Sequence, residues 1–320
     1  MPSSRRRSRR KRRPLRVGTD CSGIEAPIQA LKNLGVPFRH VFSSDIDKYC
    51  IQSILANYEP ELLFGDPNGK FPDGDIRKRK MSDVPDLDLY VCGFPCQPFS
   101  QAGMKKGLED PRGNVFEACL KVIRKKLPKY FILENVRGLL SNDGGRTWDT
   151  IWKKLQRLKR YGVSWKLLNT KDYGIPQSRP RVFIVGVRDG EPFDFPEPFE
   201  SDTKLQDLVD FGDLSKKVVA PCYRKKVAKA RALGAYFVDP QMAGGPRRSL
   251  SDCAPCVCAC SDQYWCVKIG RQANVKELLA LQGFPGDFRQ AVSTTQLKRQ
   301  LGNSMSVNVL ESIIGKLLRT

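Results

Sequence analysis

One cysteine stands between two prolines in the segment 93–100, Gly-Phe-Pro-Cys-Gln-Pro-Phe-Ser. Pro95 has a fixed φ and Pro98 lacks an N–H, so the chain around Cys96 can neither wind into a helix nor join a sheet ladder. The Cys96 thiol is therefore expected on a loop. A thiol is nucleophilic as its thiolate, which requires partial exposure and a positive or hydrogen-bonding neighbourhood. We predict that Cys96 performs covalent catalysis.

Two further segments place charged side chains directly beside predicted strands. Glu134 follows four apolar residues, 130–133, where a carboxylate is costly unless it is hydrogen-bonded or used. Arg179 and Arg181 stand two residues apart at the entry to another apolar segment, so we expect their side chains to point the same way. Such a pair suits a base carbonyl and a nearby phosphate, and surface salt bridging is the alternative.

Short apolar segments and helical periodicity predict the elements that position these groups. The expected strands span 15–19, 41–44, 87–92, 130–133, 163–169 and 182–187, and the expected helices span 26–34, 46–55, 115–126, 147–158 and 274–282, with a final helix ending at 318. Strands that alternate with helices indicate an α/β fold. Open α/β sheets place their sites at the carboxyl ends of strands, where Cys96 and Glu134 are expected.

A turn of small and polar residues, 20–25, connects the first strand to the first helix. Strand, turn and helix N-terminus together form a cradle for a nucleotide-type cofactor. The G-x-G-x-x-G pattern of dinucleotide sites is missing from this turn. Asp45 ends the second strand about twenty residues later, the place where a carboxylate reads ribose hydroxyls, with helix capping as the alternative.

These segments resemble the motifs of the C5-cytosine DNA methyltransferases. The segment 93–100 resembles the nucleophile motif of that family, 134–136 its Glu-Asn-Val motif, and 177–181 its Q-x-R-x-R pattern. Two later segments, 283–285 and 300–307, resemble late motifs. The matches run in order over roughly residues 15–320. The resemblance implies a Rossmann-like S-adenosylmethionine methyltransferase sheet with helices on both faces, and a smaller irregular target-recognition domain.

The resemblance also implies an activity and roles for single residues. Cys96 would add to C6 of a cytosine flipped out of the duplex, and C5 would take a methyl group from S-adenosylmethionine. Glu134 would hold the cytosine ring and Arg181 its O2, with Arg179 supporting the site. The residues implied in cofactor binding are Cys21, Ser22, Gly23, Ile24, Glu25, Asp45, Ile46, Asp75, Ile76, Gly93, Pro95, Asn303 and Ser304. Asp66 rivals Asp75 as the adenine contact, and no metal is required.

Composition suggests four parts along the chain. We expect a disordered basic arm over 1–14, a catalytic and cofactor-binding domain over 15–190, a target-recognition domain over 191–270, and a C-terminal segment, 271–320, that returns to the catalytic domain. Proline residues and basic patches replace periodic segments from about residue 191 onward.

The expected recognition domain contains cysteines that need an explanation. Cys253 and Cys256 form a C-x-x-C pair, which is typical of zinc sites. No second pair with structural-zinc spacing follows, and Cys256, Cys258 and Cys260 alternate as strand residues do. We therefore predict metal-free thiols.

The charge of the chain indicates its partner. There are 55 Lys and Arg against 34 Asp and Glu, a net charge of +21, with a dense basic block over 5–13. Such a surface attaches to polyanions, which favours double-stranded DNA. We expect a monomer, with a cognate restriction endonuclease as a possible partner. The single histidine, His40, precedes an apolar pair and is expected to be structural, which argues against Ser-His-Asp hydrolysis.

The sequence also bears on location and on rival functions. No apolar segment approaches the ~18 residues of a membrane span, and no secretory signal follows the basic block. We expect an intracellular, DNA-associated protein, nuclear in a eukaryotic host and cytoplasmic otherwise, with reduced thiols. The tRNA-methylating branch of the family is one rival, but its Cys-Phe-Thr signature is missing. An inactive DNA-binding regulator is another, against which the intact Cys96, Glu134 and Arg181 argue.

Overall fold

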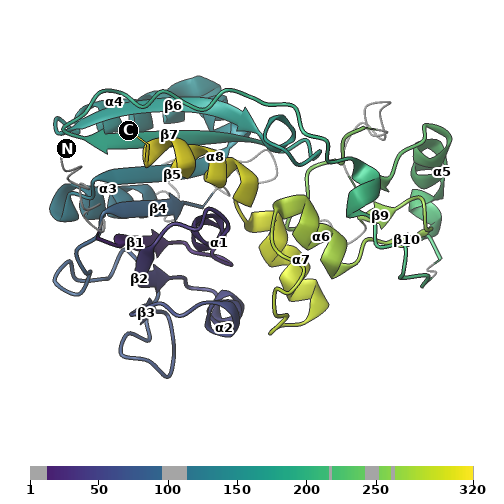
Figure 1. Cartoon of the computed structure of the whole chain (residues 1–320), viewed down its shortest axis with the longest axis horizontal. Helices are drawn as coiled ribbons and strands as arrows, with labels where there is room; N and C mark the ends of the chain where they lie inside the picture. The colour runs from purple at the N-terminus through teal and green to yellow at the C-terminus, as the bar shows by residue number, and fades with distance from the viewer. Residues whose placement is uncertain (1–12, 96–113, 216–217, 242–251, 261–263, 320) are drawn as a thin grey trace, which may run out of the picture.

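Seven strands form one mixed sheet in the order β3-β2-β1-β4-β5-β7-β6 (Figure 1). The computed structural model describes residues 13–95, 114–215, 218–241, 252–260 and 264–319. The strands are β1 (Leu15–Asp20), β2 (Phe38–Ser44), β3 (Leu63–Phe64), β4 (Leu89–Gly93), β5 (Tyr130–Val136), β6 (Tyr161–Asn169) and β7 (Pro180–Arg188). Neighbours among β1 to β5 are parallel, and β7 is antiparallel to both β5 and β6. The predicted α/β fold is confirmed.

Helices cover both faces of this sheet, as predicted (Figure 1). They are α1 (Ala26–Asn33), α2 (Lys48–Asn57), α3 (Asn114–Lys126), α4 (Arg146–Gln156) and α8 (Val307–Leu317). Successive strand residues point to opposite faces. Val91 and Ile132 therefore pack in one core with residues of α1 and α8, whereas Tyr90 and Phe131 pack in another with residues of α3 and α4. Each strand in the middle of the sheet is apolar on both faces because both faces are covered.

A smaller lobe lies at the other end of the molecule (Figure 1). It contains α5 (Arg224–Ala232) and a three-stranded antiparallel sheet made of β8 (Phe237–Val238), β9 (Trp265–Cys266) and β10 (Arg271–Gln272). Trp265 packs there against Val227 and Val238 in a core of its own. The helices α6 (Val275–Gln282) and α7 (Thr294–Asn303) lie between this lobe and the large sheet.

The observed elements correct several predicted boundaries. β5 continues through Glu134 to Val136, so this carboxylate lies within the strand and not after it. The helix α7 was not predicted, because Leu297 and Leu301 are its only apolar residues and give too short a periodic pattern. Both leucines are fully buried. Short 3-10 helices add turns at Arg137–Leu140, Asn142–Gly145, Thr170–Asp172, Leu205–Leu208 and Pro221–Tyr223.

The strand expected over Cys256 to Cys260 is not formed. Ala254 makes an isolated bridge with Gln177, and residues 255–258 have no ladder partner among the described residues. Side chains satisfy this backbone in place of a neighbouring strand, because the N–H of Val257 donates to Gln177 Oε1 at 3.0 Å and its carbonyl accepts from Arg179 at 2.6 Å. Alternation of cysteines therefore misled the prediction.

A buried ion pair fixes the loop before β4 to the carboxyl edge of the sheet. Arg79 donates to both oxygens of Asp20, at 2.8 Å each, and the hydroxyl of Tyr90 donates to the same carboxylate at 2.8 Å. The guanidinium lies 5.1 Å from the centre of the Phe42 ring and 4.5 Å from that of Phe64. Cation–π contact and full burial make this pair part of the core.

We expect Arg79→Met to lower the free energy of unfolding by about 3–5 kcal/mol, because it leaves the buried Asp20 carboxylate without its cation. Urea denaturation of the full chain measures this loss. The control is Arg39→Met, which breaks the exposed pair between Arg39 and Glu61 and should leave stability almost unchanged. Equal losses in the two variants would contradict the structural role of Arg79.

Candidate catalytic and cofactor site

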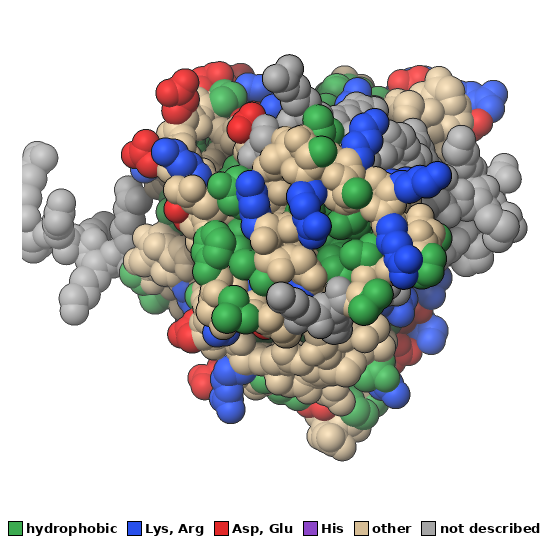
Figure 2. Space-filling model, turned by 90° about the vertical axis from the view of Figure 1, so that its right-hand side faces the viewer, with side chains coloured by type: hydrophobic (Ala, Val, Ile, Leu, Met, Phe, Trp, Pro, Cys, Tyr) green, Lys and Arg blue, Asp and Glu red, His purple; other side chains and the backbone are tan. Residues whose placement is uncertain are grey.

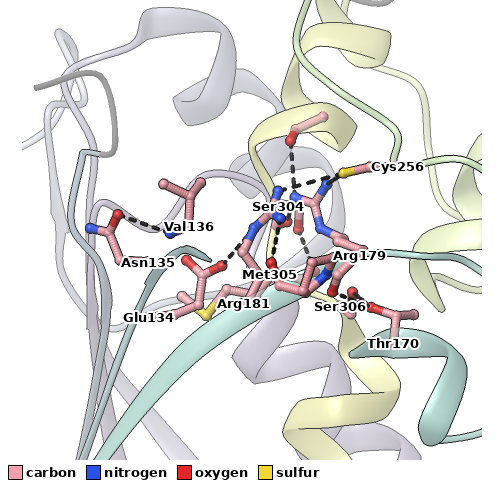
Figure 3. A network of polar contacts seen from close by, with 12 residues as sticks. Glu134, Asn135, Val136, Thr170, Arg179, Arg181, Cys256, Ser304, Met305 and Ser306 are labelled. Carbon is pink, nitrogen blue, oxygen red and sulfur yellow. Dashed lines mark hydrogen bonds and ion pairs between the residues drawn. The ribbon is translucent and has the colours of Figure 1, made fainter. Parts of the chain in front are cut away.

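Three adjacent strands bring together Glu134, Arg181 and Gly93, which lies three residues before Cys96. Gly93, the last residue of β4, is in register with Glu134 on β5. β7 enters beside the end of β5, with Arg181 opposite Val136. Arg181 Nε lies 3.3 Å from Glu134 Oε1, and both side chains are nearly buried (Figure 3). Cys96 itself lies outside the described residues, but the strand that leads to it ends against Glu134.

The environment of Glu134 changes its protonation. Burial raises the pKa of this carboxyl, and the nearby charges of Arg181 and Arg179 oppose the shift without cancelling it. Glu134 therefore retains a proton at higher pH than an ordinary glutamate. A raised pKa makes this carboxyl a better proton donor at a given pH than an ordinary glutamate.

Asn135 fixes the backbone just before Cys96. Its buried side chain donates from Nδ2 to the carbonyl of Phe94 at 3.0 Å and accepts from the N–H of Val136 at 2.9 Å. Asn135 was not among the site residues expected from the sequence. The signal was present, because a buried amide beside a predicted strand end needs a hydrogen-bond partner.

Gly93 allows close packing at the same point. A Cβ at this position would lie 3.0 Å from Met305 Cε and 3.5 Å from Glu134 Oε2. Met305 belongs to the segment between α7 and α8, so the C-terminal part of the chain reaches the start of the Cys96 loop. In this segment the predicted cofactor residue Ser304 is buried and Asn303 is exposed.

Arg179 is a buried centre of hydrogen bonds. Its Nη1 donates to the carbonyl of Val257 at 2.6 Å, and its Nη2 donates to those of Gly302 at 2.9 Å and Ser304 at 2.5 Å (Figure 3). One side chain therefore joins β7, the smaller lobe and the C-terminal segment. Arg179 and Arg181 point the same way, as predicted, since both contact the sulfur of Cys256.

At the ends of β1 and β2, Gly23, Asp45 and Ile46 form an open surface, the ledge. Gly23 has a φ of 56° and its N–H donates to Asp45 Oδ2 at 2.8 Å. The hydroxyl of Ser22 accepts from the N–H of Ser44 at 3.0 Å, which ties the turn to β2. A Cβ at Gly23 would meet no described atom within 4 Å, and the neighbouring Ile46 is 78% exposed. Open space at Gly23 and an exposed apolar side chain at Ile46 thus lie on either side of the partly exposed Asp45.

Asp45 is not the helix cap that the sequence left as an alternative. Asp47 caps α2 by accepting from the N–H of Tyr49 at 2.9 Å. Asp45 accepts from the N–H groups of Asp47 and Gly23, at 2.9 and 2.8 Å. Burial raises the pKa of Asp45 to about 6 although both hydrogen bonds lower it.

Three other residues expected at the cofactor point into the protein. Ile24 is buried, and Glu25 is fully buried with its Oε1 accepting from the hydroxyls of Thr19 and Ser43, at 2.6 and 2.5 Å. The thiol of Cys21 packs against the second core, beside those of Cys92 and Cys119. These residues lie behind the ledge and shape it. His40, which donates to or accepts from Ser43 at 2.8 Å, is buried as expected of a structural histidine.

Asp75 and Ile76 lie beside Asp45. A Cβ at Gly74 would be 1.9 Å from the carbonyl oxygen of Asp45, so the two backbones are in close contact. The guanidinium of Arg77 donates to the Asp75 carboxylate, at 2.6 Å for the shortest bond, and lowers the pKa of Asp75. Asp66, the rival adenine contact, accepts from the N–H of Asn68 in its own turn.

The structure shows no group of three or more His, Cys, Asp or Glu side chains arranged for a metal ion within the ranges it describes. Residues 242–251 and 261–263 of the smaller lobe are not among them. The expectation of metal-free thiols therefore stays a prediction.

Comparisons with a family model and with curated proteins all find DNA methyltransferases. The family model described as C-5 cytosine-specific DNA methylase matches residues 20–233 and 261–319. Type II methyltransferase M.NgoBI of Neisseria gonorrhoeae is 38% identical over 281 residues, covering 85% of this chain and 84% of that protein. Type II methyltransferase M.SsoII of Shigella sonnei is 36% identical over 302 residues, covering 88% and 74%. A DNMT2 structure from Spodoptera frugiperda has a TM-score of 0.68 at 19% identity, covers 95% of this chain and 99% of that one, and thus shares the fold.

The hydrogen bonds of Arg179 predict that it contributes more to the stability of the fold than Arg181 does. Arg179→Lys should lower the free energy of unfolding by about 2–4 kcal/mol, because one ammonium group cannot reach three carbonyls in two distant segments. Arg181→Lys serves as the control, since its main contact is a single ion pair with Glu134. Thermal unfolding of both variants decides the matter. A larger loss from Arg181→Lys would show that Arg179 does not hold the segments together.

Proposed function

Since the chain belongs to the C-5 cytosine-specific DNA methylase family, we propose that it methylates cytosine C5 through a covalent bond between Cys96 and C6 of a flipped base. The observation that carries this proposal is the Glu134–Arg181 pair at the point where β4 leads into the Cys96 loop. An acid and a cation beside a nucleophile are the groups that this reaction requires.

Cytosine C5 is a weak nucleophile until a group adds to the ring. Addition of the Cys96 thiolate to C6 makes C5 electron-rich, and loss of the C5 proton and of the thiolate restores the ring after methylation. When bound, S-adenosylmethionine supplies the methyl group from its sulfonium centre. C6 is hidden in a stacked duplex, so the base must leave the helix before Cys96 can reach it.

Glu134 and Arg181 would hold the ring and offset its developing charge. A protonated Glu134 donates to N3 of cytosine and accepts from the exocyclic amino group. The raised pKa of Glu134 supports this role, because an ordinary glutamate has lost its proton at neutral pH. Arg181 donates to O2 of the ring. Arg179 supports both residues from behind through its carbonyl contacts.

The ledge at the ends of β1 and β2 fits S-adenosylmethionine. Asp45 would accept from the ribose hydroxyls, and Ile46 offers an apolar surface. Asp75 would accept from the adenine amino group, with Ile76 beside it. The backbone at Ser22 and Gly23 would approach the amino-acid end, and Gly93, Pro95, Asn303 and Ser304 would complete the site. Cys21, Ile24 and Glu25 would support the turn from the side of the core.

We assign DNA recognition to the smaller lobe, within residues 191–270. Figure 2 shows the face at this end of the molecule, where Lys and Arg side chains surround hydrophobic ones. The helix α5 contributes exposed basic side chains, namely Arg224, Lys225, Lys229 and Arg231. The basic arm, 1–14, lies almost wholly outside the described residues and would add nonspecific attraction to phosphates.

The remaining assignments concern partners and location. The relatives are Type II methyltransferases of bacteria, which supports a cognate restriction endonuclease as partner and action on DNA in the cytoplasm. Within the described chain, every helix is too short or too polar to cross a membrane. A monomer suffices for the proposed chemistry, because Glu134, Arg181 and the Cys96 loop come from one chain.

A mechanism-based trap tests the covalent step. Duplex DNA that carries 5-fluorocytosine at the target should form a denaturation-resistant complex in the presence of S-adenosylmethionine, because fluorine at C5 cannot leave as a proton does. Gel electrophoresis under denaturing conditions detects the complex. Cys96→Ser should form none. A wild-type enzyme that methylates ordinary DNA without forming the complex would disprove the covalent mechanism.

The raised pKa of Asp45 predicts how cofactor binding depends on pH. The carboxylate accepts hydrogen bonds from ribose and the acid does so poorly, so affinity should fall once the pH drops below about 6. Between pH 7.5 and 5.0 we expect a loss of roughly tenfold, since protonation costs up to tenfold per pH unit. Calorimetry with S-adenosylmethionine measures this. Asp45→Asn should bind more weakly with a flatter profile, and an equally steep profile would exclude Asp45.

A further inference from the structure

Cys256 lies against the two arginines of the candidate catalytic site. The sulfur of Cys256 is 3.3 Å from Arg179 Nη1 and 3.7 Å from Arg181 Nη2 (Figure 3). Arg181 in turn contacts Glu134, so the guanidinium group of Arg181 connects Cys256 to the candidate catalytic acid. Cys256 is part-buried, and the proposed methyl transfer assigns it no step.

The surroundings of Cys256 favour its thiolate. A hydrogen bond from the thiol of Cys258 and the charges of Arg179 and Arg181 hold the pKa of Cys256 well below its ordinary value, although burial raises it. The pKa of Cys258 is raised, as expected of the donor. Cys253, three residues away and also part-buried, has Lys171 as its cationic neighbour, and burial still raises its pKa to about 11. Two nearby cysteines thus differ in the environment that controls reactivity.

We propose that Cys256 is a modification site, a thiol that small peroxides oxidise to a sulfenic acid beside Arg179 and Arg181. The sulfur of the thiolate attacks one peroxide oxygen, an S–O bond forms, and the O–O bond breaks. For hydrogen peroxide the leaving group is hydroxide. Sulfur is oxidised by two electrons and the peroxide is reduced by two.

The pocket offers donors for the added oxygen. The side chain of Arg179 is 1% exposed, and its Nε has no hydrogen-bond partner among the described residues. A sulfenate oxygen on Cys256 would lie near the guanidinium groups of Arg179 and Arg181, which already contact the sulfur. Charge-assisted hydrogen bonds of this kind stabilise the oxidised form against its thiol.

Oxidation of Cys256 should also suppress methyl transfer. A sulfenate competes for the guanidinium of Arg181, which the proposed mechanism requires at O2 of the base. This consequence rests on the proposed function, whereas the oxidation itself does not. Two equivalents of a small thiol should restore the enzyme, because the first forms a mixed disulfide with release of water and the second releases the Cys256 thiol.

Labelling tests the thiol chemistry without methyl transfer. Full-length Cys96→Ser protein is treated with hydrogen peroxide in the presence of dimedone, which captures sulfenic acids, and the labelled peptides are quantified by mass spectrometry. We expect Cys256 to be labelled at least tenfold faster than Cys253 in the same molecule. Labelling of Cys256 at or below the rate of Cys253 overturns the proposal, whether or not the enzyme methylates DNA.

Activity measurements test whether oxidation of Cys256 suppresses methyl transfer. Wild-type protein, Cys256→Ser and Cys253→Ser are exposed to peroxide and then assayed for methyl transfer to DNA. Wild type and Cys253→Ser should lose activity at the same rate and recover it with dithiothreitol, and Cys256→Ser should lose it several-fold more slowly. Equal rates in all three proteins would exclude an effect of Cys256 oxidation on catalysis. Absence of methylation before treatment would instead count against the proposed function.

Discussion

The antiparallel direction of β7 is the constraint on which the catalytic site depends. β5 ends at the carboxyl edge of the sheet, and a parallel neighbour would end there too, with its first residues at the opposite edge. Because β7 runs the other way, its first residues meet the last residues of β5. Arg181 thereby reaches Glu134, and Arg179 reaches the segments beyond the sheet.

Arg179 extends this arrangement to parts of the chain that are remote in sequence. Its guanidinium donates hydrogen bonds to the carbonyls of Val257, Gly302 and Ser304, which belong to the smaller lobe and the C-terminal segment. A planar fork with five donors can reach carbonyls in separate segments, whereas the three donors of a lysine all leave from one nitrogen. Burial makes these bonds costly to lose, so the relative position of the segments around the pocket depends strongly on one side chain.

Buried charge accounts for both stability and chemistry at this edge of the sheet. Asp20 is fully compensated by Arg79 and Tyr90, and this network stabilises the loop that precedes β4. Glu134 and Asp45 are compensated less completely, so burial raises their pKa values. Glu134 and Asp45 have expected roles at the substrate and the cofactor, and carboxyl groups with perturbed pKa values often lie at functional sites.

Local sequence was sufficient for the parts of the site that depend on strand periodicity. The apolar segments before Asp45, Glu134 and Cys96 predicted strands whose ends share one edge, and the spacing of Arg179 and Arg181 predicted that they point the same way. Asn135 follows Glu134 directly, so its position at the strand end could be predicted in the same way.

Tertiary structure decided everything that depends on contacts between distant segments. The ion pair of Arg79 with Asp20, the helix α7 and the unpaired backbone near Cys256 were not predicted. Cysteine alternation suggested a strand at Cys256, yet Arg179 and Gln177 supply the hydrogen bonds that a neighbouring strand would have supplied. The sequence determines which groups need partners, because burial and backbone chemistry are local properties. Which partners they find depends on how the chain brings residues from separate segments together.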